Sequence, residues 1–392
     1  MAPGTLRIAM LGTRGVPARY GGFETAVEEV GRRLVGLGHE VTVYCRRGND
    51  PAEPTEHLGM RLVTLPALRR RSLETLSHTG LSVGHLMRRR PDVAFVFNAA
   101  NAPWLPLVRL ARVPVATHVD GLEWRRAKWG PAGRRYYRAV EGVAVRLSDA
   151  IIADAEGIRA YYRWSFGIET TLLAYGAPII AEPRADRLAE LDLTARGYHL
   201  VVARFEPENH VREIVEGYRI STATRPLVVV GAAPYSDAYT AQVRAAAGED
   251  PRIRFLGGVW DQELLDQLYG GALTYLHGHS VGGTNPSLLR AIGSGTATVA
   301  FDVGFNREVL RADGAYFRDP VDLAARIAEA EAQPGATRDR ETALRERARD
   351  YDWDEVAEGY ARLAADLVAG RHPRPRPHRR RTEPNPTRGD LP

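Results

Sequence analysis

The sequence predicts an α/β fold with two doubly wound domains, and three observations support this prediction. Short apolar runs rich in β-branched residues alternate with helical stretches, as in parallel sheets that carry helices on both faces. The same alternation starts again near the middle of the chain. A length of 392 residues also exceeds what one hydrophobic core usually supports.

The first domain is predicted over residues 1–180. Its apolar runs are nearly continuous, which fits strands that are buried on both faces, so we expect a Rossmann-like domain here. The N-terminal run has neither the charged start nor the cleavage site of a signal peptide. The predicted strands are 6–11, 40–44, 60–65, 92–97, 113–117 and 149–153.

A second Rossmann-like domain is predicted over residues 181–351. The segment 176–196 holds prolines and mixed charges, as connections between domains do. An amphipathic helix that begins with acidic residues is predicted at 352–370. The predicted strands of this domain are 198–203, 227–231, 252–256, 272–277 and 297–301.

The net charge of +5 lies in the tail 371–392, which carries seven arginines against two carboxylates. The remaining body is therefore neutral, and nucleic acid is not an expected partner. Six prolines and the lack of apolar periodicity predict that this tail is disordered. It is either a contact with an anionic membrane surface or a solubilising extension.

No run reaches the roughly 18 apolar residues that a membrane-spanning helix needs. The single cysteine, Cys45, excludes an intrachain disulfide and gives no sign of an oxidising compartment. We therefore expect a cytoplasmic protein, and the basic tail leaves peripheral contact with the inner membrane face open.

A glycine-rich loop follows the first predicted strand, with the sequence GTRGVPARYGGFE at 12–24. Gly21 and Gly22 allow the backbone close to a ligand, and the helix that starts after them offers free amides to an anion. Arg14 and Arg19 fit phosphate oxygens. The loop lacks the spacing of a P-loop and of a dinucleotide fingerprint. The alternative interpretation is a structural turn.

A histidine and two carboxylates follow the fifth predicted strand, in the sequence HVDGLEWRR at 118–126. A hydroxyl acceptor in group transfer loses its proton, and Asp120 is the first candidate for the base that assists. The alternative is that Asp120 turns the chain together with Gly121, while Glu123 pairs with a neighbouring arginine.

Arg204 ends the first predicted strand of the second domain, just before a helix that starts near Pro207. An arginine and a helix N-terminus at this place would stabilise the negative charge of a departing diphosphate. The alternative role of Arg204 is a salt bridge at a domain interface.

The densest motif is HGHSVGGTNPSLLRA at 277–291, where a predicted strand leads through a glycine-rich turn into a helix. Because Thr284 or Asn285 is placed to cap that helix and Pro286 lies in its first turn, the nearby amides are predicted to hold a pyrophosphate. Two histidines in the motif lack further metal ligands, so no metal site is predicted. The candidate donor-binding residues here are Gly283, Thr284, Asn285 and Ser287.

These motifs resemble those of glycosyltransferase family 4, which has the two-domain GT-B fold, and most closely its bacterial rhamnosyltransferase-like branch. The resemblance covers the chain from about residue 6 to about residue 370. The motifs that carry it are GTRGVP at 12–17, YGGFE at 20–24, LGHEVTV at 37–43, VDGLEW at 119–124, ARFEPEN at 203–209, the segment 277–289 and DVGFNRE at 302–308.

The resemblance implies a retaining, metal-independent transfer from an activated sugar, without a cofactor, in the synthesis of a cell-surface glycan. It implies dTDP-rhamnose as a donor and a lipid-linked or polysaccharide acceptor. It also implies that the helix 352–370 packs back on the first domain. Matched residue by residue, Gly21 and Gly22 lie near the donor phosphates and Arg204 contacts the diphosphate, while Asp120 stands where many relatives have histidine.

Three positions depart from the family pattern. Asn209 and His210 stand where a lysine usually follows Arg204, and His210 is retained as a donor-binding candidate. Gly282 and Arg290 replace the paired glutamates that hold the sugar and the ribose of the donor, and an arginine cannot accept from ribose hydroxyls. Arg290 either binds a phosphate, which restores the missing cation, or marks a degenerate enzyme.

Two other functions therefore remain open at this stage. One is a catalytically degenerate GT-B protein that binds a glycan or a partner enzyme. The other is a sugar-nucleotide epimerase, which shares the fold and the donor but needs more acid and base groups than Asp120 supplies. An oxidoreductase is disfavoured because neither half has the glycines that hold a dinucleotide.

Overall fold

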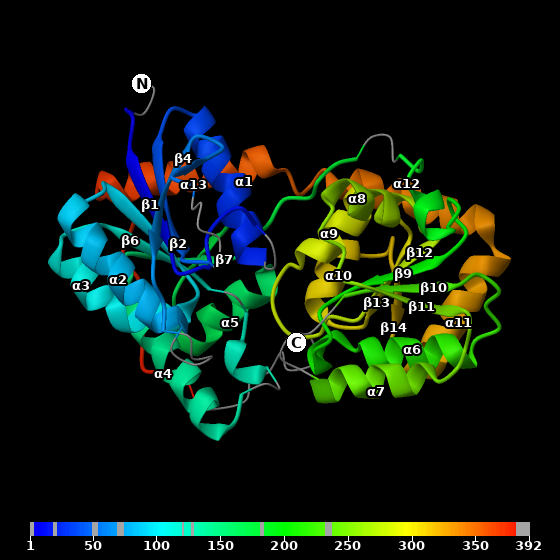
Figure 1. The fold of residues 1–392 in the computed structure, drawn as a ribbon. Coiled ribbons are helices and arrows are strands. Elements are labelled where there is room, and N and C mark those ends of the chain that lie inside the picture. The colour runs from blue at the N-terminus through cyan, green and yellow to red at the C-terminus, as the bar shows by residue number, and fades with distance from the viewer. Residues whose placement is uncertain are drawn as a thin grey trace. The chain divides into compact units, whose positions relative to one another are not determined.

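A computed structural model describes residues 4–18, 22–48, 54–68, 74–119, 121–126, 129–180, 184–231 and 237–381. The chain divides into two compact units, each built around its own sheet (Figure 1). Unit 1 runs up to Tyr175 and resumes at Trp353, and unit 2 runs from Gly176 to Asp352. The sequence places the division near residue 180.

Unit 1 contains an eight-stranded sheet. Its strands are β1 (Arg7–Leu11), β2 (Glu40–Arg46), β3 (Glu56–His57), β4 (Met60–Leu65), β5 (Val93–Phe97), β6 (Val115–Val119), β7 (Ala150–Ala153) and β8 (Thr171–Leu172). Their order is β3-β4-β2-β1-β5-β6-β7-β8, and the pairs are parallel except β3 with β4. Strands β2 to β4 extend the sheet on one side of β1, and strands β5 to β8 extend it on the other side. The strand order therefore reverses between β1 and β5.

The central strands of unit 1 are apolar because both of their faces are covered. Every residue of β5 and of β6 is buried, as the nearly continuous apolar runs predict. Strand β6 starts later than the predicted segment 113–117, because Pro114 has no amide to donate and the Val113 amide binds the carbonyl of Val108. The strand ends at Val119, so His118 belongs to the sheet.

The helices of unit 1 are α1 (Gly22–Gly36), α2 (Glu74–Arg89), α3 (Leu105–Leu110), α4 (Pro131–Leu147), α5 (Glu156–Phe166) and α13 (Trp353–Val368), with short 3₁₀ helices η1 (Ala99–Trp104) and η2 (Glu123–Arg125). Helix α13 comes last in the chain but belongs to unit 1, where Figure 1 shows it in orange-red beside the blue strands. Its Tyr360 ring packs on Phe95 of β5 at 5.0 Å between centroids. Near its start, Asp354 pairs with Arg33 of α1 at 2.5 Å.

The C-terminal arm, residues 371–381, follows α13 and lies against unit 1. The His378 amide donates to the Phe166 carbonyl at 3.0 Å, and Arg374 pairs with Asp149 at 2.8 Å. The sequence predicts disorder from residue 371 onward. The arm is ordered instead, because carboxylates and carbonyls of unit 1 bind its arginines and its backbone. The rest of the predicted tail lies outside the described residues.

Unit 2 contains a six-stranded parallel sheet. Its strands are β9 (His199–Val202), β10 (Leu227–Val230), β11 (Ile253–Gly257), β12 (Thr274–His277), β13 (Thr298–Phe301) and β14 (Ala315–Phe317). Their order is β11-β10-β9-β12-β13-β14. As in unit 1, the chain moves outward from the first strand and returns on its other side, so the order reverses between β9 and β12.

Two hydrophobic clusters cover the two faces of this sheet. Neighbouring residues of one strand point to opposite faces, and Val201 of β9 accordingly joins one cluster while Leu200 joins the other. The first cluster includes residues of α6 and α11, and the second includes residues of α8 and α9. The helices of this unit are α6 (Val211–Ile220), α7 (Asp237–Ala247), α8 (Gln262–Gly271), α9 (Pro286–Gly293), α10 (Gly304–Leu310), α11 (Pro320–Ala332) and α12 (Pro334–Ala348), with 3₁₀ helices η3 (Leu188–Leu191) and η4 (Pro207–Asn209).

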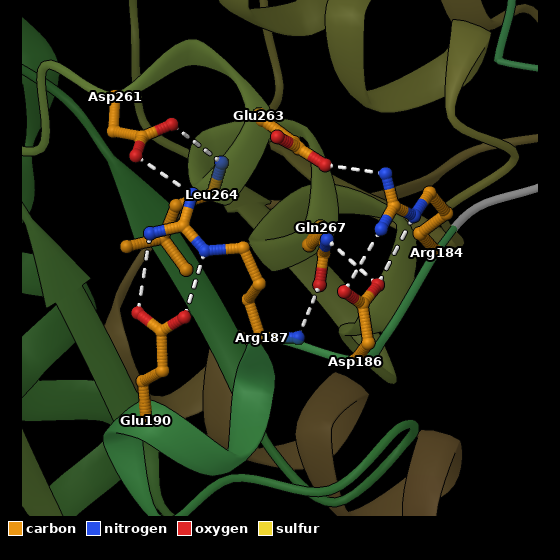
Figure 2. Close-up of polar contacts among 8 residues, drawn as sticks. All are labelled: Arg184, Asp186, Arg187, Glu190, Asp261, Glu263, Leu264 and Gln267. Atoms are coloured by element: carbon orange, nitrogen blue, oxygen red, sulfur yellow. Dashed lines mark hydrogen bonds and ion pairs between the residues drawn. The ribbon is translucent and has the colours of Figure 1, made fainter.

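A network of ion pairs fixes the start of unit 2 to α8, as Figure 2 shows. Arg187 lies between the carboxylates of Glu190 at 2.8 Å and Asp261 at 2.7 Å. Asp261 also caps α8, because its side chain accepts from the Leu264 amide at 3.1 Å. The segment before η3 therefore gains a fixed position on unit 2 through exposed charges rather than through apolar contacts.

In the described part of the chain, no helix combines the length and the apolar character that crossing a membrane requires.

Candidate functional site

The strand order marks one candidate ligand position in each unit. In doubly wound sheets, ligands bind at the carboxyl ends of the strands where the strand order reverses. This point lies between β1 and β5 in unit 1 and between β9 and β12 in unit 2. The glycine loop follows β1, and the motifs around Arg204 and after His277 follow β9 and β12. The glycine loop of unit 1 and the two motifs of unit 2 therefore lie where a ligand is expected, while the motif at 118–126 follows the next strand, β6.

The start of the glycine loop is packed tightly against β5 and β2. Gly12 has a φ of 101°, and a Cβ there would lie 2.3 Å from the carbonyl oxygen of Phe97. The Asn101 amide group donates to the Gly12 carbonyl at 3.2 Å, which joins the loop after β1 to the segment after β5. The Arg14 amide donates to the Glu24 carboxylate at 3.1 Å. This part of the loop is thus held in one conformation.

The other predicted residues of this loop are only partly visible. Gly22 is the first residue of α1 and is half-buried. Gly21 and Arg19, together with Asp120 of the second motif, lie outside the described residues. Their predicted contacts with a donor or an acceptor stay predictions.

His118, two residues before Asp120, is a buried structural residue. Burial lowers the pKa of His118 to about 3, so the ring is neutral at neutral pH. Its Nδ1 lies 2.7 Å from the Tyr360 hydroxyl, and the rings of Phe23, Phe97 and Tyr175 surround it. His118 therefore ties α13 to the sheet and has no access to a substrate in this arrangement.

The turn after β6 contains the ion pair that the sequence offers as an alternative. Gly121 adopts a φ of 54°, which favours glycine. Glu123 forms an ion pair with Arg126, whose Nε lies 2.6 Å from a Glu123 carboxylate oxygen, and both side chains are buried. The Trp129 indole also donates to Glu123 at 3.2 Å. Glu123 is thus engaged in holding the turn, which leaves Asp120 as the candidate base of this motif.

Glu141 of α4 is a buried carboxylate near the same turn, and sequence reasoning did not single it out. Its side chain is 5% exposed and pairs with Arg380 of the C-terminal arm at 3.1 Å. Burial raises the pKa of Glu141 to about 7, against the opposite effect of Arg380 and of the Tyr161 hydroxyl. A small cavity of about 10 Å³ touches Glu141 and also Val119 and Gly121, which is room for about one water molecule.

A signal for Glu141 was present in the sequence. It occupies the buried face of the amphipathic helix α4, next to Val140 and one turn from Val145. An acidic residue on the apolar face of a helix is costly unless it is paired. Its partner could not be identified from the sequence, because Arg380 lies in a segment that composition predicts to be disordered.

In unit 2, Arg204 lies just beyond β9, with half of its side chain exposed (49%). Its nearest carboxylate is that of Glu206 at 3.9 Å, a long distance for an ion pair. The Arg204 carbonyl accepts from the Asn209 side chain at 2.7 Å, which fixes the backbone of the loop. Arg204 therefore offers an exposed guanidinium at the carboxyl end of β9.

The loops after β9 and β12 are joined by several contacts. The Nδ1 atom of His210 lies 2.8 Å from the Gly278 carbonyl oxygen. The His210 ring also stacks on that of Phe301, with 4.1 Å between the ring centroids. His279 lies 2.7 Å from the Asn209 side-chain oxygen. A Cβ on Gly278 would lie 2.1 Å from the Asn209 carbonyl oxygen. Asn209 and His210, which replace the expected lysine, thus serve to lock the two loops together.

The start of α9 is capped as the sequence predicts. Asn285 is the N-cap, and its side chain accepts from the Ser287 amide at 2.9 Å. Pro286 occupies the first helical position, where a missing amide costs nothing. Thr284 is buried and Gly283 precedes it in the turn. The structure places the four candidate residues together between the end of the β12 loop and the start of α9. They are Gly283, Thr284, Asn285 and Ser287.

Both histidines of this motif contact neighbouring side chains. Burial lowers the pKa of His277 to about 3, and its Nδ1 lies 3.2 Å from the Tyr275 hydroxyl. Within the described ranges, no group of three or more histidine, cysteine or acidic side chains is arranged to hold a metal ion.

Arg290, the strongest departure from the family pattern, is paired inside unit 2. Its Nη1 lies 2.6 Å from the Asp266 carboxylate of α8, and the Arg290 side chain is largely buried. The sequence left open whether Arg290 binds a phosphate. Because Asp266 already neutralises it, Arg290 does not present an uncompensated cation, and Arg204 is the better phosphate candidate.

Another hollow of the described surface lies elsewhere in unit 2. It has a volume of about 410 Å³ and is lined by ion-paired residues beside β13 and β14. Asp302 accepts there from both Arg307 at 2.5 Å and Arg318 at 2.8 Å. These strands lie outside the point where the strand order reverses, and the arginines are compensated, so we do not assign the reaction to this hollow.

Two family models match the chain. A Glycosyl transferase 4-like domain matches residues 21–176, and a Glycosyl transferases group 1 domain matches residues 196–332. The first match falls almost wholly within unit 1, and the second lies within unit 2. No curated protein sequence matches the chain.

Solved structures resemble the whole fold. Sucrose-phosphate synthase from Thermosynechococcus elongatus superposes with a TM-score of 0.80 at 21% identity, over 93% of this chain and 100% of that one. Anabaena Alr3699/HepE in complex with UDP-glucose has a TM-score of 0.73 at 14% identity, over 92% of this chain and 100% of that one. A structure of trehalose-6-phosphate from Escherichia coli bound with UDP-2-fluoro glucose has a TM-score of 0.67 at 12% identity, over 92% of this chain and 99% of that one. At these identities the likeness concerns the fold alone.

Proposed function

Because the chain is a glycosyltransferase with the GT-B fold, we propose that it moves a sugar from a nucleoside-diphosphate donor to a hydroxyl group of a glycan or lipid-linked acceptor. Unit 2 binds the donor in this proposal, and unit 1 binds the acceptor. The observation that carries it is the pair of interlocked loops after β9 and β12, where Arg204 and the capped start of α9 lie at the reversal of strand order.

The residues of unit 2 supply what a diphosphate requires. A departing nucleoside diphosphate gains negative charge, which an exposed guanidinium and backbone amides stabilise when they are fixed in advance. Arg204 provides the guanidinium, and its backbone is fixed by Asn209. The turn at Gly283 and Thr284 and the N-terminus of α9 provide the amides. Two of the similar structures are complexes with UDP-glucose or UDP-2-fluoro glucose, which supports a donor of this class.

In the proposed step, the bond between the anomeric carbon of the sugar and the diphosphate oxygen breaks. A bond forms between the same carbon and the acceptor oxygen, and the nucleoside diphosphate leaves with the bonding electron pair. Asp120 accepts the proton that the acceptor hydroxyl loses. Arg204 binds the diphosphate as its charge grows, so its contribution is larger in the transition state than with the intact donor.

The finer details of the proposal come from the sequence motifs. They favour transfer with retention of the anomeric configuration, without a metal or a cofactor, and with dTDP-rhamnose as donor in the synthesis of a cell-surface glycan. Because two similar structures are complexes with UDP-sugars, UDP is the nucleoside diphosphate to compare with dTDP. Comparison of the anomeric configuration of donor and product by NMR tests retention, and inversion would refute it.

Contact with an anionic membrane is a further part of this proposal. Arg371, Arg374 and Arg380 of the arm pair with carboxylates of unit 1, so they are not available to lipid without loss of those pairs. Arg376 and Arg379 are exposed. Sedimentation with vesicles of phosphatidylcholine alone and with added phosphatidylserine tests it, and equal binding to both would exclude an electrostatic membrane contact.

Calorimetric titration with UDP, dTDP and GDP, each with and without Mg²⁺, tests the donor assignment. We expect one diphosphate to bind without metal, and Arg204→Gln to weaken that binding at least tenfold. Arg349→Gln is the matched control, because Arg349 is an exposed arginine just after α12 whose side chain pairs only with Glu346 among the contacts of the described residues. Undiminished binding to the Arg204 variant would move the diphosphate site elsewhere, and binding without any transfer would favour a degenerate binding protein.

A further inference from the structure

The C-terminal arm is attached to unit 1 at several points. The amides of His378 and Arg381 donate to the carbonyls of Phe166 at 3.0 Å and Ser165 at 3.1 Å, at the end of α5. The last carbonyls of a helix lack partners within the helix, so the arm satisfies groups that α5 leaves open. Arg379 and Arg380 lie between these two attachment points, and the Arg380 side chain contacts α4 and α5.

Arg380 extends from the arm to a carboxylate that is otherwise buried. Its Nη2 lies 3.1 Å from the Glu141 carboxylate and also donates to the Tyr161 hydroxyl. Its Nη1 donates to the Arg138 carbonyl at 3.1 Å. Only 23% of the Arg380 side chain and 5% of the Glu141 side chain are exposed. The pair therefore lies in the body of unit 1 rather than on its surface.

The same guanidinium contacts the turn after β6. Its carbon lies 5.8 Å from the ring centroid of Trp124 and 5.5 Å from that of Phe166. Arg138 of α4 covers the Trp124 ring at 4.4 Å. An arginine over an indole face is attracted by the ring electrons and by apolar contact. Trp124 is thus held by residues from α4 and from the arm.

The cavity beside Glu141 extends the connection to the candidate base. It is lined by Glu141 and also by Val119 and Gly121, and these last two residues flank Asp120 in the chain. Glu141 and the residues on both sides of Asp120 therefore border one small space. We expect a change in the charge or position of Glu141 to affect these two residues.

We propose that Arg380 is a positioning residue and that the C-terminal arm is a strap, which fixes the turn 119–126 and so places Asp120 for the acceptor. This inference rests on the proposed function, because it assigns that turn to the acceptor side of the transfer. It gives the basic segment after α13 a role inside the catalytic unit, in place of a purely solubilising or membrane-binding one.

The physical basis is the charge balance of the buried site. The groups that face Glu141 are Arg380 from the arm, Arg138 from its own helix, Tyr161 and Tyr162 from α5, and the turn residues Trp124 and Glu123. Loss of Arg380 removes the cation closest to a buried carboxylate, which then favours its protonated form. At the same time the ring of Trp124 loses one of the three arginines that lie over it, Arg125, Arg138 and Arg380. We expect the turn to become mobile while the sheet below it stays intact.

Hydrogen exchange measured by mass spectrometry tests the strap without any need for activity. We expect Arg380→Gln, and a chain that ends at residue 370, to raise the exchange rate of a peptide spanning 119–126 at least tenfold. Arg379→Gln and a chain that ends at residue 381 are the matched controls and should exchange as the native chain does. An unchanged exchange rate in the Arg380 variant would overturn the strap.

A double variant separates charge pairing from simple loss of packing. Glu141→Gln combined with Arg380→Gln leaves no buried charge without its partner, so exchange of the turn should return at least halfway to the native rate. Arg380→Lys keeps the charge but has fewer hydrogen-bond donors. The exchange rate of its turn should lie between that of the native chain and that of Arg380→Gln. If the turn exchanged as fast in the double variant as in Arg380→Gln alone, the ion pair itself would not be what holds the turn.

Steady-state kinetics then tests positioning. With a working donor and acceptor, Arg380→Gln should raise the KM for the acceptor about tenfold, while the Kd for the diphosphate measured by calorimetry stays within twofold of the native value. A mobile turn with an unchanged acceptor KM and kcat would overturn the positioning role. Failure of the native chain to bind any nucleoside diphosphate would instead refute the proposed function, and the exchange rates would still decide whether the strap exists.

Discussion

Replacement of Glu141 by glutamine should change how the stability of the protein depends on pH. Burial raises the pKa of Glu141 in the folded protein to about 7, compared with an ordinary value of 4.5. At about 1.4 kcal/mol for each pKa unit, this difference is worth about 3 kcal/mol. Glutamine has a similar shape and cannot ionise, so Glu141→Gln removes this contribution and little else of the packing.

The direction of the pH dependence follows from the pKa of Glu141, which is higher in the folded protein than in the unfolded chain. As the pH rises, the unfolded chain gives up the Glu141 proton first, and the folded protein has to ionise a buried group later. The stabilisation is therefore fully present below about pH 4.5 and is lost as the pH rises through about 7. The free energy of unfolding of the variant minus that of the native chain should increase by about 3 kcal/mol across this window and stay constant above it.

Urea unfolding followed by circular dichroism at pH 4.5, 6, 7 and 8 measures this difference. Glu358→Gln, which replaces an exposed glutamate of α13 that pairs with Arg362, is the matched control and should follow the native chain at every pH. The reasoning would be refuted if the Glu141 variant also paralleled the native chain within about 0.5 kcal/mol from pH 4.5 to 8. That result would mean that Arg380 compensates the carboxylate as fully as water does.

Three further predictions concern single contacts described above. Tyr360→Phe removes the partner of the buried His118 ring and should lower the free energy of unfolding by about 1–3 kcal/mol in urea; a loss below about 0.5 kcal/mol would contradict the role of this bond in holding α13. Gly278→Ala places a Cβ against a carbonyl of the neighbouring loop and should weaken calorimetric binding of the diphosphate at least tenfold, and native affinity would count against the loop assignment. Asp261→Ala removes the cap of α8 and should cost about 1 kcal/mol in thermal unfolding, whereas the exposed-site control Asp354→Ala should not disturb unit 2.

The fold could be predicted from the sequence because burial leaves a clear pattern. Strands β5 and β6 are covered on both faces, so their residues form nearly continuous apolar runs. The α/β class with two doubly wound units is confirmed by the sheets and by the similar solved structures. Strands β3, β8 and β14 were not predicted, because two or three residues at a sheet edge are too short to show a period.

The candidate site could be predicted only as far as local motifs reach. The loops after β1, β9 and β12 were located because glycine, proline and capping residues act within a few positions, and Asn285 does cap α9. The partners of Arg290 and Glu141 were not predictable, because Asp266 and Arg380 are distant in sequence and no local pattern links such pairs. The arm was predicted to be disordered because composition does not reveal a buried carboxylate elsewhere in the chain.

The discontinuity of unit 1 has a consequence for how the protein is made. A ribosome synthesises β1 through β8 first and then the whole of unit 2, and only afterwards α13 and the arm. Until those last residues emerge, His118 lacks Tyr360 and Glu141 lacks Arg380. Unit 2 is complete in one stretch of chain and can fold as it appears, whereas unit 1 has to wait. A ribosome stalled just before α13 would therefore carry a finished second unit and an unfinished first one, which a protease would distinguish.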